Sequence, residues 1–354
     1  MKQIILCLIL LLFYSFRILA QGEINKIDSL LRSTYPETGP GGVFLISKGN
    51  QILYKQAFGE ANIELNVPMH TENVFQIGSI TKQFTAVAIM MLVEEGKIDL
   101  HASIRKYISG IPHCWNAITV HHLLTHTSGI RDFTKVKGLG QISRDELTVR
   151  ELIGFFKKEK PEFKPGEQYQ YCNAGYILLG SIIEEVSGEI YEDFIEERIF
   201  KIIGMKQSYY WHPEEIIHDR AYGYLCREQC GNKPYIDPSI PYASGSLMST
   251  AGDLHLWNQA VNNKVLLNDG NTKLLFKENY LNNGALFDYG YGWHLIRINN
   301  AMTYQHGGDI FGFKSMGIYI PSQDLYIIGL TNCNCNSPTQ IVREMSEIMT
   351  KGEL

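Results

Sequence analysis

The sequence predicts an α+β fold with two lobes, in which an antiparallel sheet takes strands from both ends of the chain and an all-helical lobe is inserted between them. Strand-like apolar runs separated by turns occur over residues 43–58 and again over 301–331. Between them the pattern is mostly helical, interrupted by glycines and prolines. Helical patterns also flank the strand-forming material over 24–33 and 338–349. The sheet therefore needs both ends of the chain.

The strands are predicted by apolar runs that end at turn residues. Val43–Ile46 and Gln51–Phe58 are separated by the turn Lys48–Asn50, which predicts a hairpin. Near the carboxyl end, three more runs predict strands over 301–305, 313–320 and 325–331. The alternating aromatic residues Tyr289, Tyr291 and Trp293 predict a further strand whose aromatic face packs against a helix.

The helical region contains one segment of special interest. Phe84–Val93 is apolar on every side except at Thr85, which is typical of a helix buried all round. Other helices are expected over 120–124, 149–157, 174–186 and 191–203, and Thr250 is expected to cap another. We expect residues 21–354 to form one domain of two lobes, with an α/β lobe of about 21–75 and 285–354 and a helical lobe of about 76–284.

The composition favours a folded protein and argues against nucleic acid as the main partner. The 354 residues are 45% hydrophobic and 19% charged, which is unlike a chain too polar to collapse. The formal net charge is −5, and no basic stripe is visible. Nucleic acid is therefore not an expected partner.

The first twenty residues are typical of an export signal cut after Ala20. Lys2 supplies the basic start, and the apolar run Ile4–Phe13 is about ten residues long. This run is shorter than the roughly 20 residues that a membrane-spanning helix needs. Arg17 is unusual so near the cut, and an uncleaved membrane anchor is the alternative. We expect a periplasmic or secreted protein without stable membrane insertion after signal removal.

Removal of the signal leaves six of the seven cysteines, whose pairing the sequence leaves open. Cys226 and Cys230 could close a small loop, and Cys333 and Cys335 are expected to be too close to pair without strain. Cys114 and Cys172 stand alone. No metal or other cofactor is expected, because His122 and His126 lack the glutamate of a metalloprotease helix.

The start of the buried helix carries a candidate nucleophile. Ser79 and Lys82 are three residues apart, so their side chains share one face of a helix. The unpaired N–H groups and the dipole at a helix start favour an oxyanion formed by attack on a carbonyl. Ser103 and Lys106 have the same spacing, but they lie in a polar connection without a buried helix.

Two further motifs complete the set of candidate residues. Tyr171 and Asn173 are two apart in an extended segment, so they face one site together. His306 and Gly308 lie at the end of a predicted strand, where glycines let a substrate approach the backbone, and both are expected to bind substrate.

These motifs, in this order, resemble the three motifs of the penicillin-recognising serine hydrolases, which include class C β-lactamases, DD-carboxypeptidases, D-aminopeptidases and esterases. The resemblance extends from about residue 41 to 331, and the flanking segments that share it are Phe75–Ser79, Leu123–Gly129, Leu247–Leu254 and Tyr289–Trp293. It implies an antiparallel sheet with terminal helices beside a helical region, with the active site in the cleft between them.

The resemblance also implies roles for the motif residues. Ser79 would be the acylated nucleophile, Lys82 and Tyr171 would move its proton, and Asn173 would donate to the substrate and to the lysine. The backbone N–H groups of Ser79 and Asp309 would hold the oxyanion. The base is either a Tyr171 phenolate, which a nearby Lys82 ammonium could stabilise by about 4 kcal/mol, or a neutral Lys82 assisted by Tyr171.

The chain departs from the β-lactamase pattern at His306 and Gly307, where β-lactamases of this family usually have a lysine and a hydroxyl residue. A histidine is mostly neutral at pH 7, and glycine offers no side chain to a substrate carboxylate. This departure favours the peptidases and esterases of the family. Asp309 could pair with a substrate ammonium, although a solvated turn residue is the simpler interpretation.

We therefore expect an exported serine hydrolase that forms an acyl-enzyme on Ser79 and cleaves an amide or ester. The favoured substrate is a D-amino-acid peptide, as for a DD-carboxypeptidase or D-aminopeptidase. A class C-like β-lactamase or broad esterase is the alternative enzyme. A protein that binds β-lactams or muropeptides and is acylated without turnover is the alternative from another class. The sequence does not decide the oligomeric state.

Overall fold

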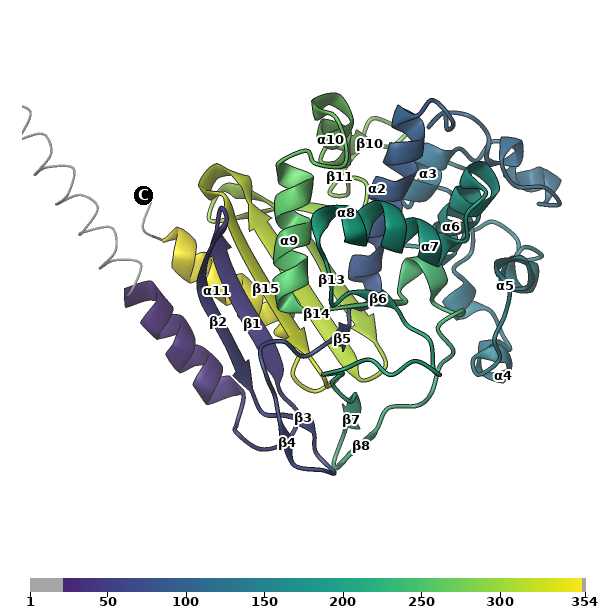
Figure 1. Ribbon diagram of the computed structural model, residues 1–354. Helices are drawn as coiled ribbons and strands as arrows, with labels where there is room; N and C mark the ends of the chain where they lie inside the picture. The colour runs from purple at the N-terminus through teal and green to yellow at the C-terminus, as the bar shows by residue number, and fades with distance from the viewer. Residues whose placement is uncertain (1–21, 352–354) are drawn as a thin grey trace, which may run out of the picture.

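The computed structural model of the protein describes residues 22–351, so the predicted export signal lies outside the described residues. A six-stranded antiparallel sheet forms one side of the molecule, with the order β12-β13-β14-β15-β1-β2 (Figure 1). The strands are β1 (Gly42–Lys48), β2 (Gln51–Phe58), β12 (His294–Ile298), β13 (Ala301–Ile310), β14 (Phe313–Ile320) and β15 (Leu325–Thr331).

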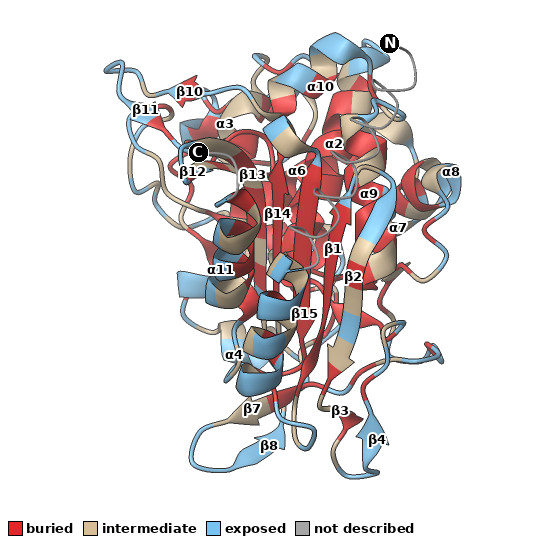
Figure 2. Cartoon of the chain, turned by 90° about the vertical axis from the view of Figure 1, so that its left-hand side faces the viewer, coloured by how far each residue is buried: buried red, intermediate tan, exposed pale blue. Residues whose placement is uncertain are grey.

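The two ends of the chain meet in the middle of this sheet. β1 pairs with β15 from Gly42 opposite Thr331 to Lys48 opposite Leu325. Every residue of β15 is buried, because helices cover both faces of the sheet (Figure 2). The helix over residues 22–34 and α11 (Pro338–Thr350) pack on one face, where Ile27, Val342 and Met345 share a core cluster. α9 (Ala251–Asn262) packs on the other face, against β1 and β15.

Beside the sheet lies the helical part of the molecule, built around α2 (Thr81–Glu94), whose residues are almost all buried. α6 (Asn173–Ser187) and α7 (Tyr191–Ile195) pack against it. The other helices are α3 (Val120–Leu124), α4 (Leu139–Ile142), α5 (Val149–Phe156), α8 (Lys201–Ile203) and α10 (Asp269–Leu275). The α+β two-lobed fold class predicted from the sequence is confirmed, whereas the predicted lobe boundaries stay predictions.

Short strands connect these parts of the molecule. β5 (Phe75–Gln76), β9 (Leu247–Ser249) and β6 (Tyr209–Tyr210) form a small sheet beside the start of α2. The remaining pairs are β3 (Glu60–Asn62) with β4 (Val67–Pro68), β7 (Tyr224–Cys226) with β8 (Cys230–Asn232), and β10 (Asn279–Tyr280) with β11 (Leu286–Phe287). Within residues 22–351, no helix is both long enough and apolar enough to span a bilayer.

Two local predictions were wrong. Tyr289, Tyr291 and Trp293 do not lie on a strand; they precede β12 in irregular chain, although all three are buried as expected. These aromatic side chains are buried against separate partners and do not share one face of a strand. Tyr289 contacts His306, and the Tyr291 hydroxyl lies 2.8 Å from Nδ1 of His121.

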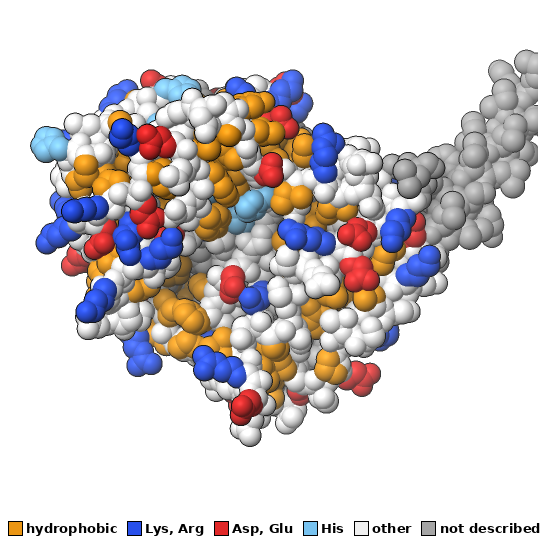
Figure 3. Space-filling model, turned by 180° about the vertical axis from the view of Figure 1, so that it is seen from behind, with side chains coloured by type: hydrophobic (Ala, Val, Ile, Leu, Met, Phe, Trp, Pro, Cys, Tyr) orange, Lys and Arg blue, Asp and Glu red, His pale blue; other side chains and the backbone are white. Residues whose placement is uncertain are grey.

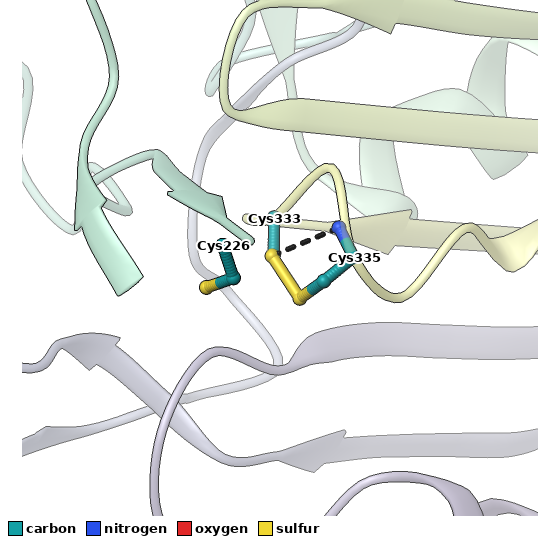
Figure 4. Close-up of side chains that lie close together, drawn as sticks. All are labelled: Cys226, Cys333 and Cys335. Carbon is teal, nitrogen blue, oxygen red and sulfur yellow. Dashed lines mark hydrogen bonds between the residues drawn. A yellow bond between two sulfur atoms is a disulfide. The ribbon is translucent and has the colours of Figure 1, made fainter. Parts of the chain in front are cut away.

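The second error concerns the cysteines, because Cys333 pairs with Cys335 in addition to the pair Cys226–Cys230. The Sγ atoms of Cys226, Cys333 and Cys335 lie within 4.8 Å of one another (Figure 4). All three sulfurs are already in disulfides, so none is free to bind a metal as a thiolate. The two disulfides lie side by side because β7 bonds to the chain after β15, where the Tyr224 N–H donates to the Asn332 carbonyl over 2.9 Å.

Candidate active site

Ser79 lies in a short 3₁₀ turn, Gly78–Ile80, that leads directly into α2. Gly78 has a left-handed φ of 52°, and an ideal Cβ at this position would lie 3.0 Å from the backbone nitrogen of Asp309. Glycine is therefore required here by both backbone conformation and space. The result is that the end of β13 closely approaches the nucleophile turn.

Lys82 lies one turn further into α2 and is fully buried. Its Nζ atom is 2.9 Å from Ser79 Oγ, 2.8 Å from Asn173 Oδ1 and 2.8 Å from the carbonyl oxygen of Ser244. Burial lowers the pKa of Lys82 to about 7, and the Asp132 carboxylate opposes this shift. A substantial fraction of Lys82 is therefore neutral near pH 7.

Asn173 is the first residue of α6, and Tyr171 precedes that helix by two residues. The structure brings both residues to Lys82: the Tyr171 ring centre is 4.9 Å from Nζ. Within residues 22–351, the buried Tyr171 hydroxyl has no hydrogen-bond partner. Burial raises the pKa of Tyr171 well above 10, although the nearby Ser79 hydroxyl acts in the opposite direction. This environment disfavours a Tyr171 phenolate as the base.

Asp132 is a buried residue of the site that the sequence motifs did not include. Its Oδ2 accepts hydrogen bonds from the backbone N–H of Asn173 over 2.5 Å and from Nδ2 of Asn173 over 3.1 Å. Its Oδ1 accepts from the N–H and the hydroxyl of Thr134. Because Nδ2 donates to Asp132, Oδ1 of Asn173 is turned toward Lys82, so Asn173 accepts from the lysine and does not donate to it as expected. Asp132 is therefore a positioning residue, and the Asp-x-Thr pattern of a turn was its available signal.

His306 lies behind the site rather than in the substrate cavity. It is 2% exposed, with its Nδ1 2.6 Å from the carbonyl oxygen of Gly307 and its Nε2 3.1 Å from the hydroxyl of Tyr289. A carbonyl only accepts, so Nδ1 carries the hydrogen and Tyr289 donates to Nε2. Burial lowers the pKa of His306 well below 6.5. The expectation that His306 contacts substrate directly does not fit this position; its ring instead lies 6.0 Å from the Tyr171 ring.

Gly308 lets β13 approach the nucleophile turn. An ideal Cβ on Gly308 would lie 2.0 Å from the carbonyl oxygen of Ile77 and 2.3 Å from Ser315 Oγ. The Ser315 hydroxyl donates to that same carbonyl over 2.8 Å. Gly308 therefore acts by allowing this close approach, and it does not line the substrate cavity.

We predict that Gly308→Ala is destabilising and nearly inactive. The added methyl group would force β13 away from Ile77, which costs about 1–3 kcal/mol or more and displaces the Asp309 N–H from Ser79. Thermal unfolding and ester hydrolysis measure the two effects. Gly307→Ala is the milder comparison, because its Cβ would lie 3.3 Å from the carbonyl oxygen of Ser315, which needs a far smaller shift than the 2.0 Å contact at Gly308. Equal melting temperatures for the two variants would contradict the prediction.

A cavity of about 520 Å³ opens at Ser79. Ser79, Asn173, Asp309, Lys314 and Arg227 line it together with apolar side chains, among them Phe133, Ile240 and Phe311. The face of the molecule in Figure 3 is hollowed near its middle, with hydrophobic side chains gathered around the hollow. The Asp309 side chain is 74% exposed at the cavity, and Lys314 Nζ is 2.8 Å from its Oδ2. Of the predicted site residues, Ser79, Asn173 and Asp309 line this cavity. Lys82 is fully buried and reaches the site through its contacts with Ser79 and Asn173, and the Tyr171 ring lies beside its Nζ atom.

Comparison with known proteins places this geometry in a family. Residues 34–345 match the sequence profile of the β-lactamase family. Penicillin-binding protein 4* of Bacillus subtilis (strain 168) is 30% identical over 331 residues, which cover 88% of this chain and 72% of that protein. The protein belongs to the β-lactamase family. It is a serine hydrolase of this family.

Two further comparisons describe relatives of this β-lactamase-family protein. The octameric penicillin-binding protein homologue from Pyrococcus abyssi superposes with a TM-score of 0.80 at 29% identity, covering 92% of this chain and 77% of that chain. The D-aminopeptidase of Gluconobacter oxydans (strain 621H) is 24% identical over 306 residues, which cover 86% of this chain and 57% of that protein.

In this β-lactamase-family enzyme, we predict that Asp132→Asn lowers kcat/KM about ten- to a hundredfold. An amide cannot accept four hydrogen bonds as the carboxylate does, so Asn173 loses its fixed orientation toward Lys82. Loss of the negative charge also lowers the pKa of Lys82 further, because Asp132 currently raises it. The acid limb of the pH profile should therefore move to lower pH.

A pH series of kcat/KM checks this prediction, with Asp145→Asn at an exposed position as the control. A merely structural role for Asp132 would lower activity without moving the acid limb. If the acid limb of the kcat/KM profile has the same midpoint pH in Asp132→Asn as in the parent, the predicted change in the pKa of Lys82 is wrong.

Proposed function

We propose that Ser79 attacks a carbonyl carbon and forms an acyl-enzyme, with neutral Lys82 as the base. The hydrogen bonds at Nζ carry this proposal. A neutral amine has two N–H groups and one lone pair. Two of the partners of Lys82 are carbonyl oxygens, of Asn173 and Ser244, which can only accept. When Lys82 is neutral, its lone pair is left for the Ser79 hydroxyl at 2.9 Å, and this hydroxyl donates to the base; in the charged form Nζ donates to Ser79 Oγ instead.

The reaction then follows from the positions of these groups. As Ser79 Oγ bonds to the carbonyl carbon, its proton passes to Lys82, and the charge on the carbonyl oxygen faces the N–H groups of Ser79 and Asp309. Collapse of the intermediate expels an amine or alcohol, which takes the proton from Lys82. Water then attacks the acyl-enzyme by the same route and releases the acid. Tyr171, with its raised pKa, takes part as a neutral hydroxyl close to Ser79.

We further propose that the substrate is a D-amino-acid peptide with a free carboxylate, as for a DD-carboxypeptidase. The ionised side chains that line the cavity are Arg227, Lys314 and Asp309, and Asp309 is already paired with Lys314. The lining therefore has a net charge of one positive, carried by Arg227, and this charge favours a substrate carboxylate over a substrate ammonium. The family includes penicillin-binding proteins, and this supports the choice of peptide.

D-aminopeptidase activity is the second candidate. The exposed Asp309 carboxylate at the cavity favours it, since a substrate ammonium could replace Lys314 as its partner. One relative is also named a D-aminopeptidase. Asp309→Asn separates the two candidates: it should raise KM for D-Ala-nitroanilide under this second function and leave KM for a D-Ala-D-Ala peptide unchanged under the first.

A substrate panel tests the proposed function. Purified protein is assayed with a D-Ala-D-Ala peptide, D-Ala-nitroanilide, nitrocefin and nitrophenyl acetate. We expect turnover of the D-Ala-D-Ala peptide to be fastest and turnover of nitrocefin to be weak, because positions 306 and 307 depart from the lysine and hydroxyl pair of the β-lactamases. Fastest turnover of nitrocefin would support a β-lactamase instead. A stoichiometric burst without turnover would support a β-lactam or muropeptide sensor.

We also propose that the protein is exported and that its signal is cut after Ala20, on the strength of the basic start and the short apolar run. Amino-terminal sequencing of the protein from the periplasm or medium tests this proposal. A mature protein that begins at Gln21 is expected. A protein that keeps residues 1–20 and sediments with membranes would support the anchor instead.

A further inference from the structure

A second cavity of about 200 Å³ lies close to the substrate cavity, beside the small sheet of β5, β9 and β6. Its lining includes Gln76, Trp211, Arg220, Lys233 and Phe313. Gly312 lines the substrate cavity, and an ideal Cβ on it would lie 2.7 Å from Lys233 Cβ. The two cavities therefore share a wall that is little more than one backbone thick.

This second cavity contains two cations without a counterion. Within residues 22–351, neither Lys233 nor Arg220 forms an ion pair with a carboxylate. Burial and the charge of Arg220 lower the pKa of Lys233 to about 8. The Nζ atom of Lys233 is 5.3 Å from the ring centre of Trp211 and 5.9 Å from that of Phe313. An anion between the two cations would relieve their repulsion and would lie against aromatic walls.

The same cavity is lined by two residues with buried, unpaired polar atoms. Trp211 is 8% exposed and Gln76 is 6% exposed. Within the described chain, Trp211 Nε1 and Gln76 Oε1 have no hydrogen-bond partner. Buried polar groups are usually hydrogen-bonded, so a ligand that bonds to these two atoms would satisfy both of them. The indole N–H needs an acceptor, such as a carboxylate oxygen, and the amide oxygen needs a donor.

We propose that this cavity binds a small carboxylate that has an apolar or aromatic body and a hydrogen-bond donor next to the carboxylate. Lys233 and Arg220 face the carboxylate, Trp211 donates to it, and Gln76 accepts from the neighbouring hydroxyl or N–H. The volume of about 200 Å³ corresponds to roughly six or seven waters at about 30 Å³ each, which suits a ligand the size of one aromatic acid. Gln76 lies three residues before Ser79, so an occupied cavity also supports the strand that leads to the nucleophile.

The test uses mandelate, which combines a carboxylate, an adjacent hydroxyl and a phenyl ring. Calorimetric titration is carried out on the full-length Ser79→Ala protein, so that the result does not depend on catalysis. We expect Lys233→Met in this background to weaken mandelate binding at least about tenfold and Trp211→Phe about fivefold. Mandelamide, which lacks the charge, should bind at least about tenfold more weakly than mandelate.

Two controls separate this cavity from other sites. Lys160→Met changes an exposed lysine and should leave mandelate affinity unchanged. Arg227→Met removes a cation from the substrate cavity and should also leave it unchanged. Loss of binding in Arg227→Met but not in Lys233→Met would place the ligand in the substrate cavity and overturn the proposal. No binding of mandelate at millimolar concentration, or equal binding of mandelamide, would also overturn it.

Folding of the variants is checked by thermal unfolding without ligand. Lys233→Met should not lower the melting temperature, because the lowered pKa shows that the charged lysine is costly at this position. If Lys233→Met does not fold, Trp211→Phe and the comparison of mandelate with mandelamide still decide the proposal. Unchanged mandelate affinity in a folded Trp211→Phe would count against it.

Discussion

Replacing Ser79 with alanine is expected to lower kcat by at least about 10⁴-fold and to abolish covalent labelling by a fluorophosphonate or a fluorescent penicillin. Among residues 22–351, Ser79 carries the only hydroxyl that is hydrogen-bonded to Lys82 Nζ, so no neighbouring hydroxyl is placed to take over the attack. The half-buried Ser79 side chain contributes little packing, and the melting temperature should therefore change only slightly.

Ser103→Ala is the matched control for this prediction. Ser103 has the same spacing to a lysine, but it caps the short 3₁₀ turn Ile104–Lys106 instead of facing a buried amine. It should keep full labelling and full turnover. Retained labelling in Ser79→Ala, or loss of labelling in Ser103→Ala, would show that the nucleophile has been assigned wrongly.

The part of the site that could be predicted is the part set by local spacing. Ser79 and Lys82 meet because residues three apart share a helix face, and the 2.9 Å contact is a direct consequence. The sheet was predictable for a related reason, since its apolar runs and turns are local signals. The pairing of β1 with β15 then follows from the need to bury both runs.

What could not be predicted depends on loops that are distant in sequence. The carbonyl oxygen of Ser244 comes from the short 3₁₀ helix Tyr242–Ser244, and the carboxylate of Asp132 comes from the residue that caps another short turn. No apolar periodicity marks either residue. The orientation of His306 was missed because a strand has two faces, and only the packed structure shows which face meets Tyr289. Likewise, Cys333 and Cys335 come within bonding distance through the turn that follows β15.

The second large effect is expected from Lys82→Met, which keeps the length and apolar volume of the side chain but removes the base. We expect kcat/KM to fall about 10²- to 10⁴-fold, the usual contribution of a general base. The variant should fold at least as well as the parent, because its side chain needs no hydrogen bonds in a fully buried position. Thermal unfolding and steady-state kinetics measure the two quantities.

The pH dependence identifies Lys82 more specifically than the loss of activity does. Because burial lowers its pKa to about 7, the neutral base is present above pH 7, and kcat/KM of the parent should fall as the pH drops below 7. The residual activity of Lys82→Met should lack this acid limb. An acid limb with the same midpoint in the variant would assign the titration to another group.

The lowered pKa of Lys82 also predicts how the folding stability of the protein depends on pH, and this dependence is an independent test. The lysine has a pKa of about 10.4 in the unfolded chain, so between about pH 7 and 10 the unfolded state binds more protons than the folded state. The contribution of Lys82 to folding stability therefore rises with pH across this window. Lys82→Met should be more stable than the parent at pH 7, and this advantage should shrink toward pH 10. A difference in stability that does not vary with pH would mean that Lys82 is charged in the folded protein, and the base would then have to be sought elsewhere in the site.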